Sequence, residues 1–198
     1  MSISMPRRRA SLERSVISIE RLPAVLKRFR LSRGLSQFHA ARAAGIHLGS
    51  LCQIESQIEG TRISPLSKLL AALGYRLSEL QAALDQPPLH RTWEADEPQS
   101  RDSRRRFPQA GEHLFPLDLL GPALAQIRIP TGLTQVYVGR ACGLSRGQLC
   151  SYETGSGIPR VVTLCRILET LGSNLADFEG VIGQLRTTLP PLRRKSLL

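Results

Sequence analysis

The chain contains the same segment twice, and this repeat constrains its fold more than any other feature. Residues 22–80 align with residues 120–178 at a constant offset of 98 without a gap, and 19 of the 59 aligned positions are identical. The identical residues include glycines, spaced leucines, and an arginine and a glutamate that lie 25 residues apart. Glycines that end helices and leucines at helical spacing belong to a folded core, so the sequence predicts two copies of one small domain.

The repeat and the local composition divide the chain into five segments. We expect a basic N-terminal arm at 1–20, a first domain at 21–84, a linker at 85–115, a second domain at 116–184 and a basic C-terminal tail at 185–198. The linker is expected to be flexible because it is rich in Pro, Gln, Ser and charges of both signs and has no helical apolar period. Each domain is expected to be all-α, with four or five short helices.

Helix ends can be assigned from the turn and capping residues. The glycines expected to end helices are Gly34, Gly45, Gly74, Gly132, Gly143 and Gly172. The residues expected to cap helix N-termini are Ser36, Ser78, Thr134 and Ser145. One difference between the copies is that Gln57 and Thr61 stand where the second copy has Gly155 and Pro159. We therefore expect the third helix of the first domain to run on to Gly60.

The charge of the chain points to a polyanionic partner. The formal net charge is +11 with a pI near 10.7, which favours nucleic acid first and an acidic membrane surface second, with solubility alone as the alternative. The first domain has nine basic and three acidic residues, whereas the second has five of each. The histidines and cysteines show no catalytic or zinc-binding spacing, so we expect neither an enzyme nor a metal or cofactor. No signal peptide or membrane-spanning run is found, which predicts a cytoplasmic location.

One motif occurs in both copies. It reads GLSQ, seven residues, GI, eight residues and Glu in the first copy, and GLTQ, seven residues, GL, eight residues and Glu in the second. Together with ETGSGIPRVVTLCRILETLG in the second copy, the motif resembles the Cro/repressor-type (Xre-like) helix-turn-helix family. The resemblance implies two tandem lambda-repressor-like bundles in a sequence-specific, double-stranded-DNA-binding transcription regulator associated with the nucleoid.

The same resemblance assigns DNA contacts, because the third helix of such a bundle enters the major groove. In the second domain Arg146 suits guanine and Gln148 suits adenine. In the first domain Leu48 offers only apolar contact. Gln37 and Gln135 are implied to touch phosphate or a base edge, and Arg42 and Arg140 to take phosphates. The remaining implied contact positions are His47, Gly49, Ser50, Gln53, Ser145, Gly147 and Ser151.

The resemblance also implies a partly buried ion pair in each domain, Arg30 with Glu55 and Arg128 with Glu153. The linker of about 31 residues has a typical span of about 30 Å, which matches one turn of DNA. Since the domains differ, an imperfect or asymmetric repeat is expected as the DNA site. Two alternatives stay open. One or both domains bind a protein, as in an antiactivator, an antitoxin-like partner or an adaptor, and the chain forms a homodimer or remains single.

Overall fold

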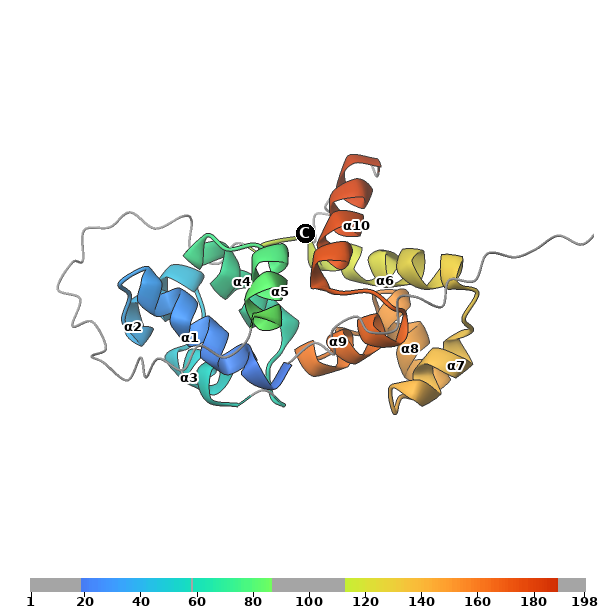
Figure 1. The fold of residues 1–198 in the computed structure, drawn as a ribbon, viewed down its shortest axis with the longest axis horizontal. Coiled ribbons are helices and arrows are strands. Elements are labelled where there is room, and N and C mark those ends of the chain that lie inside the picture. The colour runs from blue at the N-terminus through green and yellow to red at the C-terminus, as the bar shows by residue number, and fades with distance from the viewer. Residues whose placement is uncertain (1–18, 58, 87–112, 189–198) are drawn as a thin grey trace, which may run out of the picture.

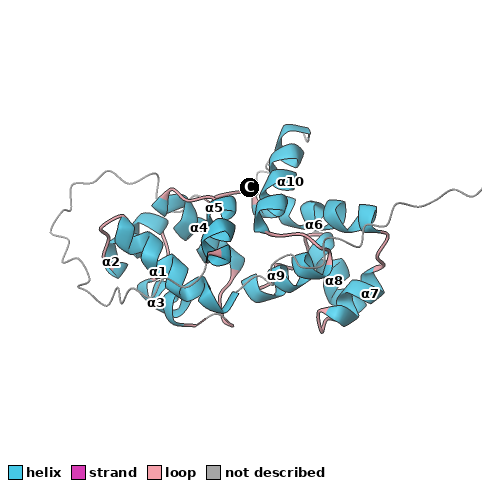
Figure 2. Cartoon of the chain, viewed as in Figure 1, coloured by secondary structure: helices cyan, strands magenta, loops and turns pink. Residues whose placement is uncertain are grey.

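The computed structural model describes residues 19–57, 59–86 and 113–188. The expected basic arm with Arg7–Arg9, most of the expected linker and the end of the basic tail lie outside these residues. The described residues are helical and contain no β-strand (Figure 2), which confirms the prediction of an all-α fold. No helix among them is long and apolar enough to cross a membrane.

The first bundle comprises residues 19–86. A 3-10 turn at Ile19–Arg21 leads into α1 (Leu22–Ser32), and α2 (Gln37–Ala44), α3 (Leu48–Ser56), α4 (Ile63–Leu73) and α5 (Leu77–Asp85) follow. Leucines on the inner faces of α1, α4 and α5 are fully buried, and Leu51 and Ile54 bury the inner face of α3.

The second bundle comprises residues 113–188 and repeats this plan. A 3-10 turn at Leu117–Leu119 leads into α6 (Leu120–Arg128), and a second one covers Ile129–Thr131. The helices α7 (Gln135–Ala141), α8 (Arg146–Glu153), α9 (Val161–Thr170) and α10 (Leu175–Thr188) follow. Because α10 extends to Thr188, the last helix continues past the expected end of the domain at 184.

Most of the expected helix ends are confirmed. Gly45 and Gly74 adopt left-handed conformations directly after α2 and α4, with φ of 59° and 70°. Ser36, Thr134 and Ser145 cap α2, α7 and α8 as expected, because each side chain accepts a backbone N–H of the first turn.

Two expected helix boundaries in the first bundle are wrong. The third helix does not reach Gly60, because α3 ends at Ser56 and Gln57 is extended, with φ of −138°. Ser78 does not cap the fifth helix but lies inside α5, which begins at Leu77. The N–H groups of Leu77 and Ser78 are instead satisfied by Glu179 of α10, a partner that no local sequence pattern indicates.

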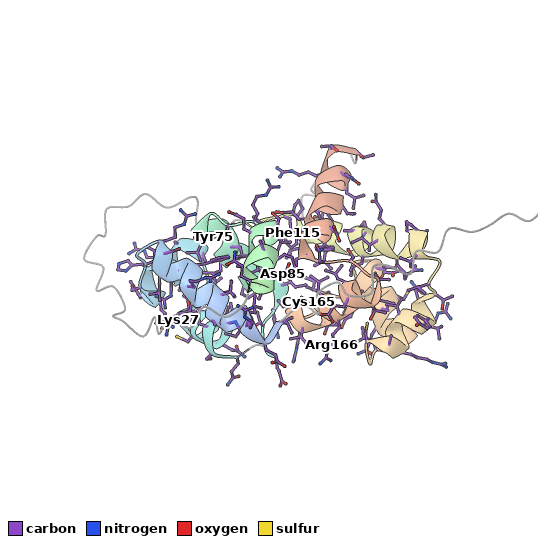
Figure 3. The ribbon with its side chains drawn as sticks, viewed as in Figure 1. Lys27, Tyr75, Asp85, Phe115, Cys165 and Arg166 are labelled. Carbon is purple, nitrogen blue, oxygen red and sulfur yellow. The ribbon has the colours of Figure 1, made fainter. Side chains whose placement is uncertain are left out.

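The two bundles pack side by side with α5 and α10 against each other at the junction, and α2 and α7 lie at opposite ends of the molecule (Figure 1). Their buried residues form one continuous hydrophobic cluster. Phe115, at the end of the expected linker, is buried and packs edge-to-face on Phe178 of α10, with ring centroids 6.2 Å apart. Figure 3 shows Phe115 at this junction, next to α5 and α10.

The contacts at the junction are reciprocal. Gln81 of α5 accepts a hydrogen bond from the backbone N–H of Leu175, and Glu179 of α10 accepts one from the backbone N–H of Leu77. Gln81 and Glu179 are equivalent in the repeat, and so are Leu77 and Leu175. Arg62 and Arg160, also equivalent, pair as an antiparallel bridge. Reciprocal contacts of this kind define an isologous interface, so one chain contains the arrangement that a symmetric dimer builds from two.

Candidate nucleic-acid interface

In the first bundle, α3 is fixed on α1 by a buried ion pair. Arg30 Nε lies 2.7 Å from Glu55 Oε1 and Arg30 Nη2 lies 2.9 Å from Glu55 Oε2. Arg30 Nη1 also donates to the carbonyl oxygen of Leu35, at the turn before α2. The Arg30 side chain is fully buried and that of Glu55 is 3% exposed. The pair therefore holds α1, α3 and the turn together, as the family resemblance implied.

The second bundle repeats this arrangement with more access to water. Arg128 Nε and Nη2 donate to the two carboxylate oxygens of Glu153 at 2.6 and 2.9 Å, and Arg128 Nη1 donates to the Leu133 carbonyl. The Arg128 side chain is 15% exposed. Burial raises the pKa of the Glu153 carboxyl, but hydrogen bonds from Arg128 and Gln135 lower it by more, so the pKa lies below its ordinary value.

The exposed N-terminal half of α8 carries the expected base-reading residues of the second bundle. Ser145, Arg146, Gly147 and Gln148 are all exposed, whereas Leu149 points into the core. Among the described residues no acidic side chain pairs with Arg146. Gln148 Oε1 accepts the N–H of Ser145, and Ser145 Oγ accepts the N–H of Gln148. The amide nitrogen of Gln148 takes no part in this capping box.

The same face of α3 is less polar. His47 caps α3, because its Nδ1 accepts the N–H of Gly49 at 3.1 Å. Leu48 is 39% exposed, Gln53 is exposed and Ser50 is partly buried. Ser151, the equivalent of Gln53 in α8, is partly buried and shares a hydrogen bond with Ser156. The structure thus brings the expected residues of each third helix to one surface, with a stronger hydrogen-bonding set on α8.

Gln37 and Gln135 have a role that the sequence did not indicate. Gln37 Nε2 donates to Glu55 Oε2 at 2.9 Å, and Gln135 Nε2 donates to Glu153 Oε2 at 2.8 Å. Each amide therefore completes the hydrogen bonding of a buried carboxylate and extends the ion pair to the start of α2 or α7. Their contact with DNA stays a prediction. Arg42 and Arg140, in the last turns of these helices, are exposed.

Two further exposed arginines lie at the junction of the bundles and were missed by sequence reasoning. Arg62 and Arg160 lie directly after the loops that follow α3 and α8, and both are exposed. They pair across the junction, and Arg160 Nη1 donates to the Glu59 carbonyl at 3.3 Å. No acidic side chain of the described residues pairs with either. Their identity in both copies was the available signal.

The second bundle also exposes apolar side chains next to α8. Ile129 is 65% exposed, Tyr137 is 58% exposed and Val136 is 40% exposed. A shallow pocket of about 490 Å³ lies on the outer face of α7 and is lined by Thr134, Val136, Tyr137, Arg140 and Ala141. In the first bundle Phe38, the equivalent of Val136, is 58% exposed.

The four cysteines are free thiols. Cys52 of α3 and Cys150 of α8 are partly exposed, and Cys52 Sγ donates to Gln37 Oε1 at 3.5 Å. Cys142 and Cys165 are buried, and burial together with the charge of Glu169 raises the pKa of the Cys165 thiol to about 12. Within the described residues no group of His, Cys, Asp and Glu is placed to hold a metal ion.

Comparison with known proteins finds a helix-turn-helix family model that matches residues 124–178, which span α6 to the first turn of α10. No curated protein and no solved structure matches the chain. The second bundle is therefore similar to the Xre-like helix-turn-helix family, which is a DNA-binding regulatory family, and the match does not extend to the first bundle. The match supports, in general terms, a DNA-binding regulator of transcription.

Proposed function

We propose that this protein is a transcription regulator that binds double-stranded DNA sequence-specifically through both bundles, with α3 and α8 in adjacent major grooves. The family match covers the second bundle alone. The observation that carries the proposal for the first bundle is the duplicated network of Arg30, Glu55 and Gln37, which fixes α3 on its scaffold with the same hydrogen bonds as in the second. Side chains held by such a network are preorganised for a base edge.

The reciprocal junction supports a specific architecture for the DNA site. Two heads related by an isologous contact read half-sites in opposite orientations, about one helical turn or 34 Å apart. The two third helices differ at the positions expected to read bases. Where α8 has Arg146 and Gln148, α3 has Leu48 and Ser50. The proposed site is therefore an imperfect inverted repeat, with one half-site read by hydrogen bonds and the other largely by apolar and phosphate contacts.

The contact roles follow from the side-chain chemistry. Arg146 donates to O6 and N7 of guanine, and the amide of Gln148 donates to a base edge beside it. Arg42, Arg140, Arg62 and Arg160 neutralise phosphates. Since the first bundle has a net charge of +4 and the second of +1, we assign more of the sequence-independent affinity to the first bundle and more of the sequence readout to the second.

Selection of bound fragments from random duplex DNA tests the proposal. We expect enriched fragments with two unlike half-sites in opposite orientation, and a complex that contains one chain per site. On the selected site, Arg146→Ala is expected to weaken binding by about 1–3 kcal/mol and to relax the preference at one base pair. Arg186→Ala is the matched control, because it removes one exposed arginine from the far end of α10 (Figure 1).

The outcome that contradicts the proposal is equal binding of all duplexes by the wild type, or unchanged sequence preference in both Arg146→Ala and Gln148→Ala. Gln148→Ala also removes part of the capping box, so its thermal unfolding is measured in parallel. Binding is titrated against salt, since contacts with phosphates predict a steep decrease in affinity with ionic strength.

One observation favours a second candidate function. The exposed Ile129, Val136 and Tyr137 beside the α7 pocket suit an apolar protein contact, as in an adaptor or an antitoxin-like partner. A Tyr137→Ser variant distinguishes the two functions. If the second bundle binds DNA, the Tyr137→Ser variant keeps the base preference given by Arg146. If the second bundle binds a protein instead, even the wild type shows no sequence preference at the second half-site.

A further inference from the structure

The first turn of α5 takes only part of its capping from its own bundle, where Glu79 accepts the N–H of Arg76. Its N-cap residue is Arg76, whose side chain accepts no hydrogen bond. The backbone N–H groups of Leu77 and Ser78 are satisfied by Glu179 of α10, at 3.4 Å from Oε1 and 3.1 Å from Oε2. Arg76 Nε also donates to Glu179 Oε1 at 3.3 Å. A carboxylate beside a helix N-terminus and an arginine is the favourable arrangement for this charge, so α5 is capped by the second bundle.

The equivalent position on α10 is different. Asn174 Oδ1 accepts the N–H groups of Ala176 and Asp177, and Asp177 accepts the N–H of Asn174. Only the N–H of Leu175 is left for the other bundle, and Gln81 Oε1 accepts it at 3.2 Å. Gln81 is 4% exposed and its Nε2 donates to Asp85, so a neutral amide meets the needs of this helix end.

The two helix ends therefore require different partners. A first bundle paired with another first bundle would place Gln81, with a single acceptor oxygen, beside the N–H groups of Leu77 and Ser78 and would take Glu179 away from Arg76. A second bundle paired with another second bundle would place Glu179 at the end of α10, where Asn174 stands in place of Arg76 and already accepts two of the N–H groups. A partly buried carboxylate without a counter-charge and an unsatisfied N–H are both costly, so both homotypic pairings are disfavoured.

We propose that Glu179, Arg76 and Gln81 form a pairing code that makes the surface of each bundle specific for the other bundle and closes it to a like bundle of a second copy. The partner that fits the α5 surface is one with a carboxylate at the position of Glu179. The partner that fits the α10 surface is one with a neutral amide at the position of Gln81. The fixed pairing keeps one α3 and one α8 together, and the code itself does not depend on DNA binding.

An exchange variant of the full chain, Gln81→Glu combined with Glu179→Gln, tests the code with composition and net charge unchanged. Both contacts of the native pairing become mismatched, whereas like bundles become matched. We expect amide hydrogen exchange at Leu77, Ser78 and Leu175 to be at least about tenfold faster than in the wild type under native conditions. Native mass spectrometry is expected to detect a shift toward assemblies of two chains at raised protein concentration.

Two single variants keep the test decisive if the exchange variant does not fold. Glu179→Gln is expected to accelerate exchange at Leu77 and Ser78 and to leave Leu175 unchanged, and Gln81→Glu is expected to do the reverse. An exchange variant with wild-type protection at all three amides and an unchanged mass overturns the proposal. DNA affinity is recorded separately, so that loss of the pairing code and loss of DNA binding are distinguishable.

Discussion

Arg62 and Arg160 occupy equivalent positions in the two repeats and pair with each other as an antiparallel bridge at the junction of the bundles. Both are exposed, and no acidic side chain of the described residues neutralises either one. The bridge joins the two backbones, and like charges directly opposite each other in an antiparallel pair are unfavourable, so the side-chain charges do not stabilise the junction. An anion at this point, such as a phosphate of the proposed DNA site, would offset these charges.

The first prediction follows from this pair. In Arg62→Ala combined with Arg160→Ala, we expect lower DNA affinity and a reduction of about two in the slope of log affinity against log salt, since each phosphate contact contributes about 0.9. Unfolding by urea without DNA is expected to require at least as much denaturant as in the wild type. Filter or fluorescence titrations at several salt concentrations measure the slope, and Arg186→Ala serves as the control. An unchanged slope in the double variant would remove both arginines from the interface.

A second prediction compares the two ion pairs. Glu55→Ala leaves the fully buried guanidinium of Arg30 without a counter-charge and is expected to lower the free energy of unfolding by about 3–5 kcal/mol. Glu153→Ala makes the same chemical change beside Arg128, which is 15% exposed and can gain water, so its effect is expected to be smaller. Urea unfolding followed by circular dichroism gives both values. Equal losses in the two variants would mean that burial does not decide the energy of these pairs.

The third prediction concerns acid. Burial raises the pKa of Glu179, but hydrogen bonds from Ser78 and Arg76 and the charge of Arg76 lower it by more, so the pKa in the folded protein lies below its ordinary value of 4.5. A carboxyl group with a lowered pKa contributes stability above that ordinary value and loses it as the pH falls through the folded pKa. The stability difference between the wild type and Glu179→Gln should therefore be present at neutral pH and vanish in the acid range below 4.5. Thermal unfolding across this range measures it, and a difference that persists in acid contradicts the ionic role of Glu179.

The fourth prediction concerns the thiols. Only the thiolate reacts rapidly with alkylating reagents, and burial holds the pKa of Cys165 at about 12. Iodoacetamide at neutral pH should therefore modify Cys52 and Cys150, which are partly exposed, long before Cys165. Peptide mass mapping after short labelling identifies the modified residues. Bound DNA that protects Cys150 would in addition place α8 in the protein–DNA contact, whereas early labelling of Cys165 would contradict its burial.

Several parts of the fold could be predicted because their causes are local. Gly45 ends α2 in a left-handed conformation that glycine adopts readily. Ser36 caps α2 by accepting the N–H of a residue three positions away. The spacing of Arg30 and Glu55 was informative because the family resemblance supplied the geometry that joins them. The exposed set on α8 was predictable for the same reason, since one helix face repeats every three to four residues.

Other features had no local cause. Ser78 has the composition of an N-cap, yet Glu179, 101 residues away, takes that role for α5. From the sequence, Gln37 and Gln135 are expected to be surface residues that contact DNA. In the structure their amides complete the hydrogen bonding of buried carboxylates. Phe115 lies in a polar stretch and is nevertheless part of the core. Each of these side chains meets its partner only after distant segments have packed.

The sequence by itself determined the repeat, the helical class, the helix ends set by glycines and the two Arg–Glu pairs, because these depend on residue chemistry within a short stretch or on a motif. Only the tertiary structure decided that the two bundles share one core and meet through Gln81, Glu179 and the pairing of Arg62 with Arg160. Contacts between residues about a hundred positions apart depend on which apolar faces remain uncovered after each bundle has folded. Which apolar faces remain uncovered depends on the whole folded bundle and not on any single segment of the chain.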